Sequence, residues 1–259
     1  MFTETVPLSF AGDRQVARMR ELTGRDEYSV TGVDTVKAIE LLTRLLDTSP
    51  EFEAEKIRAV DLVASDRDRL LAAVYKKVFG DRIESTISCV RCKQPFDLDF
   101  SLEQVIESIE TTGSREWHRL ADGRFRAANG VSFRLPTGRD ELAGIGMTAE
   151  QVESLLLSRC VQGGEWPDGK TAFEELLEEM APLIELELVA SCPECNHVHT
   201  IHFDIQSYLL GALITERRRL LSDINCIAAA YSWSLDEILS LTRSDRRRLV
   251  DLIENENAA

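Results

Sequence analysis

The sequence has little of what several protein classes need. Its longest apolar runs, such as residues 70–74, fall far short of the roughly 20 residues that a membrane-spanning helix requires. Residues 1–14 have neither a basic flank leading into an apolar run nor a small-residue cleavage site, so no signal peptide is expected. We therefore predict a cytoplasmic protein without a membrane partner.

Cysteine and net positive charge are also lacking. Six cysteines among 259 residues are too few for a disulfide scaffold, and a reducing cytosol would keep them as thiols that can bind metal. The formal net charge of −15 repels phosphate backbones, which argues against nucleic acid as the main partner. A protein or a cation is the partner that this composition favours.

Residue patterns that support catalysis are few. His118 is the only histidine outside the segment 197–202, and no nucleophile elbow accompanies it. The glycines of 144–146 and 163–164 lack the lysine and the strand-before-helix placement of a phosphate loop. Cys160 lies within an apolar helical pattern, where a buried, inert thiol is usual. The sequence therefore predicts neither an enzyme nor a site for a small-molecule substrate.

Apolar spacing divides the chain into largely helical ends and a β-containing middle. Residues 1–30 alternate short apolar and charged groups and are interpreted as an extended N-terminal arm. Helical spacing predicts a helical region over 31–82, in which Ser65 is the expected N-cap of the second helix and Gly80 its C-terminal cap. Residues 205–259 are predicted to form a purely α C-terminal module.

The middle of the chain, residues 83–204, is predicted to be a split, zinc-ribbon-like core. Alternating segments predict a β-hairpin at each of its ends, and residues 103–183 form an inserted α/β segment between them. Within the insertion, the Asn-Gly pair at 129–130 is a strong hairpin signal. Thr148 followed by Gln151 predicts a capped helix. The expected fold class is α+β.

Two Cys-x-x-Cys pairs carry the clearest chemical signal. Cys89 and Cys92 follow a strand-like segment and precede an alternating one, and Cys192 and Cys195 do the same. This spacing lets a tight turn aim two thiolates at one ion, and two such turns complete a tetrahedron. Four sulfur ligands leave no open position for water or substrate, which predicts a structural zinc ion rather than a catalytic one.

Other roles for these residues remain open from the sequence. The cysteines could instead form disulfides or redox-active pairs, or stay as unliganded thiols. His197, His199 or His202 could replace a cysteine ligand. The simpler interpretation of these histidines is that they occupy solvated strand positions.

Several short motifs resemble one known family. Residues 228–241 read Ala-Ala-Ala-Tyr-Ser-Trp-Ser-Leu-Asp-Glu-Ile-Leu-Ser-Leu, and Arg-Arg-Arg-Leu-Val-Asp-Leu-Ile follows at 246–253. Upstream lie Leu-Pro-Thr-Gly-Arg-Asp at 135–140, Ser-Arg-Cys-Val at 158–161 and Cys-Pro-Glu-Cys at 192–195. In this order they resemble baseplate hub assembly proteins of contractile-tailed bacteriophages and related injection systems. The tryptophan-containing pattern by itself is also similar to small tail-assembly proteins of other phages.

The resemblance implies a non-enzymatic assembly factor or structural component of the baseplate hub of a contractile tail. Its partners would be hub or wedge subunits, and the protein would be cytoplasmic or incorporated in a phage tail or phage-like particle. We predict partner-binding residues Arg246, Arg247, Arg248 and Trp233, the arginines being exposed. The alternatives are a zinc-ribbon nucleic-acid-binding regulator and a metal-dependent or redox enzyme.

Overall fold

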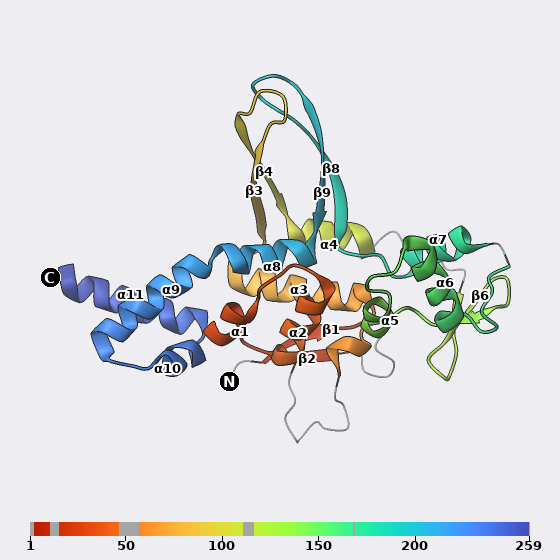
Figure 1. The fold of residues 1–259 in the computed structure, drawn as a ribbon, viewed down its shortest axis with the longest axis horizontal. Coiled ribbons are helices and arrows are strands. Elements are labelled where there is room, and N and C mark those ends of the chain that lie inside the picture. The colour runs from red at the N-terminus through yellow and green to blue at the C-terminus, as the bar shows by residue number, and fades with distance from the viewer. Residues whose placement is uncertain (1–2, 11–15, 47–56, 111–116, 168, 259) are drawn as a thin grey trace. The chain divides into compact units, whose positions relative to one another are not determined.

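The computed structural model describes residues 3–10, 16–46, 57–110, 117–167 and 169–258. The chain divides into two compact units, each drawn from separate parts of the sequence. The first unit contains residues 1–7, 16–59 and 206–259, and the second contains residues 8–15 and 60–205. Figure 1 colours the chain by residue number, from red at the N-terminus to blue at the C-terminus.

The first unit combines a two-stranded sheet with helices from both halves of the chain. Its elements are β1 (Thr3–Pro7), β2 (Val16–Arg20), α1 (Gly24–Ser29), α2 (Thr35–Leu45), all of α8 (Ile205–Thr215) except its first residue, α9 (Arg217–Tyr231), α10 (Leu235–Ser240) and α11 (Arg243–Ala258). β1 and β2 pair as antiparallel strands. α2 begins where the Asp34 carboxylate accepts a hydrogen bond from the Lys37 amide, and its apolar face is buried.

The second unit contains the remaining strands and helices. They are α3 (Ala64–Phe79), β3 (Arg82–Ser88), β4 (Pro95–Ser101), α4 (Leu102–Glu110), β5 (Trp117–Arg119), β6 (Phe125–Ala127), β7 (Ser132–Phe133), α5 (Gly138–Ala143), α6 (Ala149–Cys160), α7 (Lys170–Met180), β8 (Glu185–Ser191) and β9 (Val198–Asp204). A short 3-10 turn at Ala59–Asp61 precedes α3. The strands β5, β6 and β7 form one small antiparallel sheet.

The start of α3 differs from the prediction. The helix begins at Ala64 with Val63 as its N-cap, so Ser65 lies buried inside the first turn instead of capping it. Val63 forms a backbone bridge with Thr137, and this long-range pairing sets where the helix begins. The predicted end is confirmed, because Gly80 follows the helix with a φ of 92°, which glycine adopts without a Cβ clash.

An aromatic core holds the inserted segment together. The ring of Phe133 on β7 contacts that of Trp166, with centroids 5.7 Å apart, and Trp166 contacts Phe173 of α7 at 4.9 Å. All three side chains are buried and belong to the hydrophobic cluster of this region, which removes their large apolar surfaces from water. The predicted hairpin at 129–130 is confirmed, with Gly130 at a φ of 83°, as is the capping box that starts α6.

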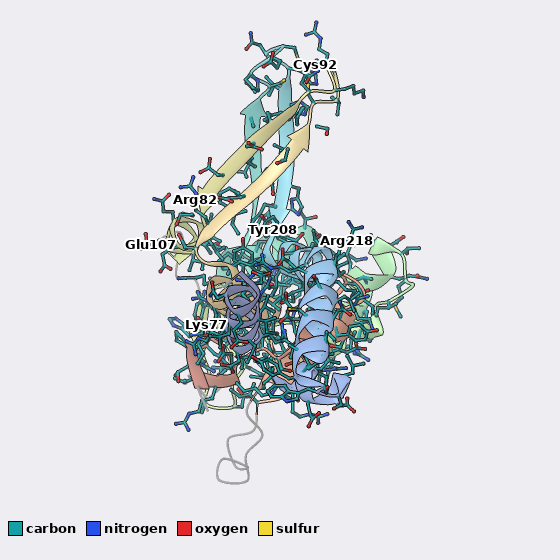
Figure 2. The ribbon with its side chains drawn as sticks, turned by 90° about the vertical axis from the view of Figure 1, so that its left-hand side faces the viewer. Lys77, Arg82, Cys92, Glu107, Tyr208 and Arg218 are labelled. Carbon is teal, nitrogen blue, oxygen red and sulfur yellow. The ribbon has the colours of Figure 1, made fainter. Side chains whose placement is uncertain are left out.

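Two β-hairpins of the second unit share one design. β3 pairs with β4, and β8 with β9, over seven consecutive positions in the same register. A helix follows each hairpin at once, and its first residue donates a backbone hydrogen bond to the residue before the hairpin, Leu102 to Asp81 and Ile205 to Ile184. Figures 1 and 2 show the hairpins side by side, with Cys92 at the tip. The predicted similarity of the two hairpins is therefore confirmed and extends to the following helices.

A second repeat joins helices inside each unit. The pentapeptide Thr-Gly-Arg-Asp-Glu occurs at residues 23–27 and 137–141, where it starts α1 and α5. In each copy the threonine and the aspartate form a capping box. A preceding arginine, Arg20 in one copy and Arg134 in the other, donates two hydrogen bonds to that aspartate.

In the first unit, residues 23–27 dock on the start of α11. The Gly24 amide donates a hydrogen bond of 3.0 Å to the Leu241 carbonyl, and Glu27 forms a buried ion pair with Arg246. A glycine is needed for this close approach, because a Cβ at position 24 would lie 2.7 Å from Nη1 of Arg246. The N-terminal helix α1 is thereby fixed to the C-terminal helix.

The second unit repeats this docking with residues 137–141 and the start of α3. The Gly138 amide donates a hydrogen bond of 3.0 Å to the Leu62 carbonyl. Both carboxylate oxygens of Glu141 accept hydrogen bonds of 2.9 Å from Arg67. In α3, as in α11, the paired arginine ends a Ser-Asp-Arg tripeptide. One docking arrangement therefore occurs once in each unit.

The structure confirms a mixed α+β fold with small hairpin sheets and helices toward both termini. The compact units do not follow the predicted linear order of regions. The predicted extended arm, residues 1–30, contains β1 and β2 but also α1. Because α1 docks on α11, most of the N-terminal region and the C-terminal module belong to the same unit.

Candidate metal centre

The first Cys-x-x-Cys turn connects β3 to β4. The Cys89 amide donates a hydrogen bond of 2.9 Å to the Gln94 carbonyl, and the Lys93 amide donates one of 2.9 Å to the Cys89 carbonyl. Lys93 has a φ of 63°, in the left-handed region, which reverses the chain after Cys92. Backbone geometry thus holds both cysteines of this pair on one tight turn.

The second turn, between β8 and β9, has equivalent backbone bonds. The Cys192 amide donates to the His197 carbonyl at 2.9 Å, and the Asn196 amide donates to the Cys192 carbonyl at 2.9 Å. Asn196 has a φ of 54°, and asparagine tolerates this region better than most residues. The two turns therefore correspond position by position.

These turns bring four sulfur atoms together. Sγ of Cys89 lies 3.6 Å from Sγ of Cys195, and Sγ of Cys92 lies 3.6 Å from Sγ of Cys192. The four Sγ atoms all lie within 4.8 Å of one another. A tetrahedral zinc ion with Zn–S bonds of about 2.3 Å requires sulfurs roughly 3.8 Å apart. The four cysteines predicted from the sequence therefore form a set that could bind one metal ion of this size.

The contacts across the site follow an approximate two-fold arrangement. Each close sulfur pair joins the first cysteine of one turn to the second cysteine of the other. Further down the strands, Phe96 faces His199 with ring centroids 5.3 Å apart, and Phe100 faces Phe203 at 5.1 Å. Both ring pairs join corresponding positions of the two hairpins. The same kind of hairpin thus supplies each half of the site.

The thiols also influence one another electrostatically. A hydrogen bond from the Cys92 amide, aided by the contact with His199, lowers the pKa of the Cys89 thiol to about 5. The Gln94 amide favours the thiolate of Cys92, but burial and the adjacent sulfurs outweigh it and raise the pKa of that thiol to about 12. Adjacent thiolates repel one another, and a bound cation would offset this repulsion.

Little apolar surface joins the hairpin tips. The buried members of their cluster are Cys89, Phe96 and Cys192, and Ile87 and Ala190 pack beside them, partly buried. An isolated two-stranded hairpin is at best marginally stable in water. Apolar packing between the tips is therefore limited to this small cluster and the ring contacts between the hairpins.

The three histidines near the second turn occupy different environments. His199 is 9% exposed, and its Nε2 lies 3.3 Å from Sγ of Cys89. The ring of His197 contacts that of His199, while the exposed His202 lies 3.9 Å from Glu185. The interpretation as solvated strand positions is wrong for His199, because strand alternation turns this residue toward the other hairpin. The sequence signal for this contact was that His199 follows Cys195 by only four positions, near enough to be considered as a possible metal ligand.

Comparison of the chain with protein-family models, curated proteins and solved structures gives no match.

The predicted partner-binding residues differ in accessibility. The Arg246 side chain is 1% exposed, whereas those of Arg247 and Arg248 are 41% and 80% exposed. The prediction that Arg246 is exposed is wrong, because its ion pair with Glu27 holds the guanidinium in the interior. Arg247, Arg248 and Trp233 remain accessible to a partner.

Two residues considered for catalysis have unremarkable surroundings for that role. Cys160 is fully buried, and burial raises the pKa of its thiol to about 11, which agrees with an inert core cysteine. His118 lies exposed on β5. Among the helices that the structure describes, none has both the length and the apolar character for crossing a membrane.

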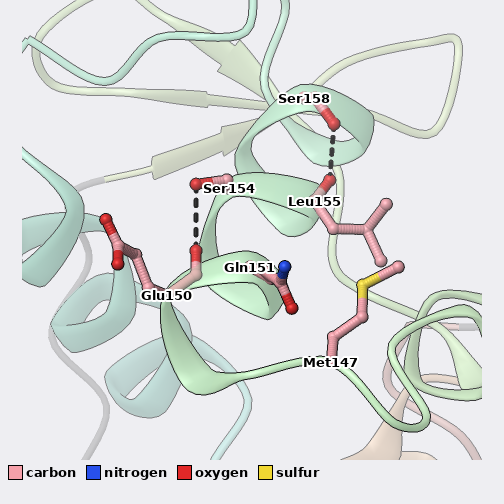
Figure 3. Close-up of a pocket in the computed structure, with 6 residues that line it drawn as sticks. All are labelled: Met147, Glu150, Gln151, Ser154, Leu155 and Ser158. Atoms are coloured by element: carbon pink, nitrogen blue, oxygen red, sulfur yellow. Dashed lines mark hydrogen bonds between the residues drawn. The ribbon is translucent and has the colours of Figure 1, made fainter.

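An open hollow borders α6 (Figure 3). Its lining residues are Met147, Glu150, Gln151, Ser154, Leu155 and Ser158. The hydroxyls of Ser154 and Ser158 donate to carbonyls of their own helix, at 2.9 and 2.7 Å. Glu150 is the single ionisable group among these lining residues, so the hollow brings together no pair of groups for acid–base chemistry.

Proposed function

We propose that the protein is a non-enzymatic assembly factor or structural component of the baseplate hub of a contractile phage tail or phage-like injection system. It acts by binding other proteins and holds one structural zinc ion on Cys89, Cys92, Cys192 and Cys195. The two hairpins and this ion form a split zinc ribbon. The metal part of the proposal rests on the four sulfurs, and the baseplate part rests on the sequence resemblance.

The observation that carries the proposal is the convergence of four thiols from hairpins that lie at opposite ends of a long insertion. An all-sulfur tetrahedral set leaves no position for a reacting water or substrate. When bound, zinc supplies charge compensation for the thiolates and a cross-link between the turns. The turns position the sulfurs through their backbone hydrogen bonds, and the hairpins then present fixed surfaces.

Fixed surfaces suit a protein that works by binding. A preorganised surface loses less conformational freedom when a partner docks, so more of the contact energy appears as affinity. The outward faces of both hairpins offer charged side chains for such contacts. Exposed carboxylates there are Glu84, Asp97, Asp99, Glu185 and Glu187.

The same charges favour a protein partner over nucleic acid. The carboxylates on the hairpins are part of the net charge of −15 and repel a phosphate backbone. Arg91 and Lys93, both exposed at the first turn, are a local exception. The regulator alternative predicts salt-sensitive binding of DNA or RNA, which a titration at two salt concentrations measures directly.

Quantitative mass spectrometry of particles purified from the native producer tests the proposal. Stoichiometric presence in intact particles would identify a structural baseplate subunit. Absence from particles, together with hub subunits that co-purify from the soluble lysate, would identify an assembly factor that departs. Absence from both kinds of complex would overturn the baseplate assignment and leave the metal site as a separate question.

A further inference from the structure

One position breaks the equivalence of the two hairpins beside the sulfurs. Position 96 of β4 is a phenylalanine, and the corresponding position of β9 is His199. The two rings pack against each other with centroids 5.3 Å apart, and the ring of His197 contacts His199 edge-on at 4.9 Å. The imidazole therefore contacts two rings.

This imidazole is placed to donate to a ligand sulfur. Nε2 of His199 lies 3.3 Å from Sγ of Cys89, within hydrogen-bond distance for a sulfur acceptor. A metal-bound thiolate can only accept, so Nε2 must carry the proton in the metal-bound protein. Because the side chain is 9% exposed, water competes little for this hydrogen bond.

We propose that His199 is a positioning residue of the metal centre, whose hydrogen bond to the Cys89 thiolate raises metal affinity and lowers the nucleophilicity of that sulfur. The inference rests on the proposed metal binding. A divalent cation with four thiolates carries excess negative charge, which is costly where little water reaches it. An N–H donor spreads that charge onto the protein, as outer hydrogen bonds do at other metal centres.

His199 should make the metal centre asymmetric, although the two hairpins that form it are nearly equivalent. Cys192 corresponds to Cys89, but the position that corresponds to His199 holds Phe96, which has no N–H to donate. The two first-position cysteines should therefore differ in reactivity although their turns are alike. His199→Phe makes the hairpins equivalent at this position and removes the difference.

Cobalt(II) loading of the full-length protein provides the test. Co²⁺ alone serves as the probe, because its sulfur-to-metal charge-transfer bands report the electron density on the thiolates. The variants are His199→Phe, His199→Gln, which keeps a nitrogen donor of similar reach, and His202→Phe as a control, because His202 lies exposed on the same strand, 3.9 Å from Glu185. Zinc affinity is measured by competition with a chromophoric chelator, and circular dichroism verifies that each variant is folded.

We expect His199→Phe to shift the charge-transfer bands to lower energy and to weaken zinc binding roughly 10- to 100-fold, the usual effect of losing an outer hydrogen bond. His199→Gln should restore most of both properties, and His202→Phe should change neither. Alkylation of the zinc-loaded protein with iodoacetamide should become faster at Cys89, located by peptide mapping, while the rate at Cys192 stays the same.

Three outcomes separate the possibilities. If the wild-type protein binds neither cobalt nor zinc, the proposed metal site itself fails. If it binds metal but His199→Phe leaves the bands, the affinity and the Cys89 alkylation rate unchanged, the role of His199 is refuted while the metal site stands. If the wild-type spectrum is that of three sulfurs and one nitrogen, His199 is a ligand and not a donor, which also overturns the inference.

Discussion

Glu27 and Arg246 lie 219 positions apart in the sequence and form an ion pair whose side chains are 4% and 1% exposed. The pair joins α1 to α11, and an equivalent pair of Glu141 and Arg67 joins α5 to α3. Breaking a buried pair by removing one partner leaves an uncompensated charge in the interior. This relationship explains why segments from both ends of the chain belong to one unit.

Removing Arg246 should destabilise the first unit strongly. We expect Arg246→Ala to lower the free energy of unfolding by about 3–5 kcal/mol, because the buried Glu27 loses its hydrogen-bonded partner and keeps only Arg243, which lies 3.9 Å away. Urea denaturation followed by circular dichroism measures this change. The matched control is Arg248→Ala, whose side chain is 80% exposed and which should change stability by less than about 0.5 kcal/mol. Equal effects of the two variants would contradict the buried-pair interpretation.

Substitution of alanine for glycine should have opposite effects on stability at two positions. At position 24 a Cβ would lie 2.7 Å from Nη1 of Arg246, whose guanidinium cannot move away without losing Glu27, so Gly24→Ala should cost about 1–3 kcal/mol. At position 211, within α8, a Cβ meets no atom within 4 Å, and Gly211→Ala should stabilise by about 0.4–1 kcal/mol. Thermal denaturation of both variants checks the signs, and destabilisation by Gly211→Ala would contradict them.

Asp68 should make stability depend on pH. Burial raises the pKa of its carboxyl to about 7 in the folded protein, although the Ile184 amide and Arg67 favour the carboxylate. The unfolded value is about 3.9, so the folded state binds the extra proton between pH ~4 and ~7 and loses stability as the pH rises through this window.

Asp68→Asn removes this dependence, since the amide oxygen of asparagine still accepts from Ile184. The variant should be more stable than the wild type at pH 8, by up to about 4 kcal/mol, and the difference should vanish near pH 4. Denaturation curves at several pH values test this, with the exposed Asp97→Asn as control. A variant that is less stable than the wild type at pH 8 would mean that Asp68 is ionised and favourably paired.

Metal removal should melt the hairpin tips selectively. A structural zinc site typically contributes about 10 kcal/mol or more of binding free energy to folding, and little apolar packing replaces it here. Chelation, or Cys92→Ser, should therefore increase hydrogen exchange in β3, β4, β8 and β9 while the aromatic core around Phe133 stays protected. Cys226→Ser lies outside the sulfur cluster and should retain one zinc per chain by elemental analysis. Unchanged exchange in the hairpins after complete metal removal would argue against a bracing role.

Surface residues of the C-terminal module should affect partner binding without affecting the fold. We expect Trp233→Ala combined with Arg248→Ala to weaken capture of hub subunits in a pull-down while the melting temperature changes little, because both side chains are accessible. Arg246→Ala is unsuitable for this purpose, since it acts on stability. Undiminished capture by the double variant would exclude these residues from the interface.

Local sequence determined several features of this protein. Three local signals each predicted the element in which they lie. They are the tight-turn spacing within each Cys-x-x-Cys pair, the Asn-Gly hairpin signal at 129–130, and Gly80 at the end of α3. These features depend on backbone preferences and hydrogen bonds over a few residues, which a single sequence records. The likeness of the two Cys-x-x-Cys turns indicated that they could share one metal ion, but their convergence across about 100 residues is a long-range contact.

Only tertiary structure decided which residues far apart meet. Arg246 lies in a run of three arginines that was predicted to be exposed, and nothing in that run indicated its burial against Glu27. His199 has the alternation of a strand residue, but which face meets the other hairpin depends on how the hairpins pair. Ser65 satisfies the local rule for an N-cap, yet the bridge from Val63 to Thr137 starts the helix earlier. For Ser65, a long-range contact outweighs a capping preference of about 1 kcal/mol; for Arg246 and His199, contacts with residues more than 100 positions away decide the burial.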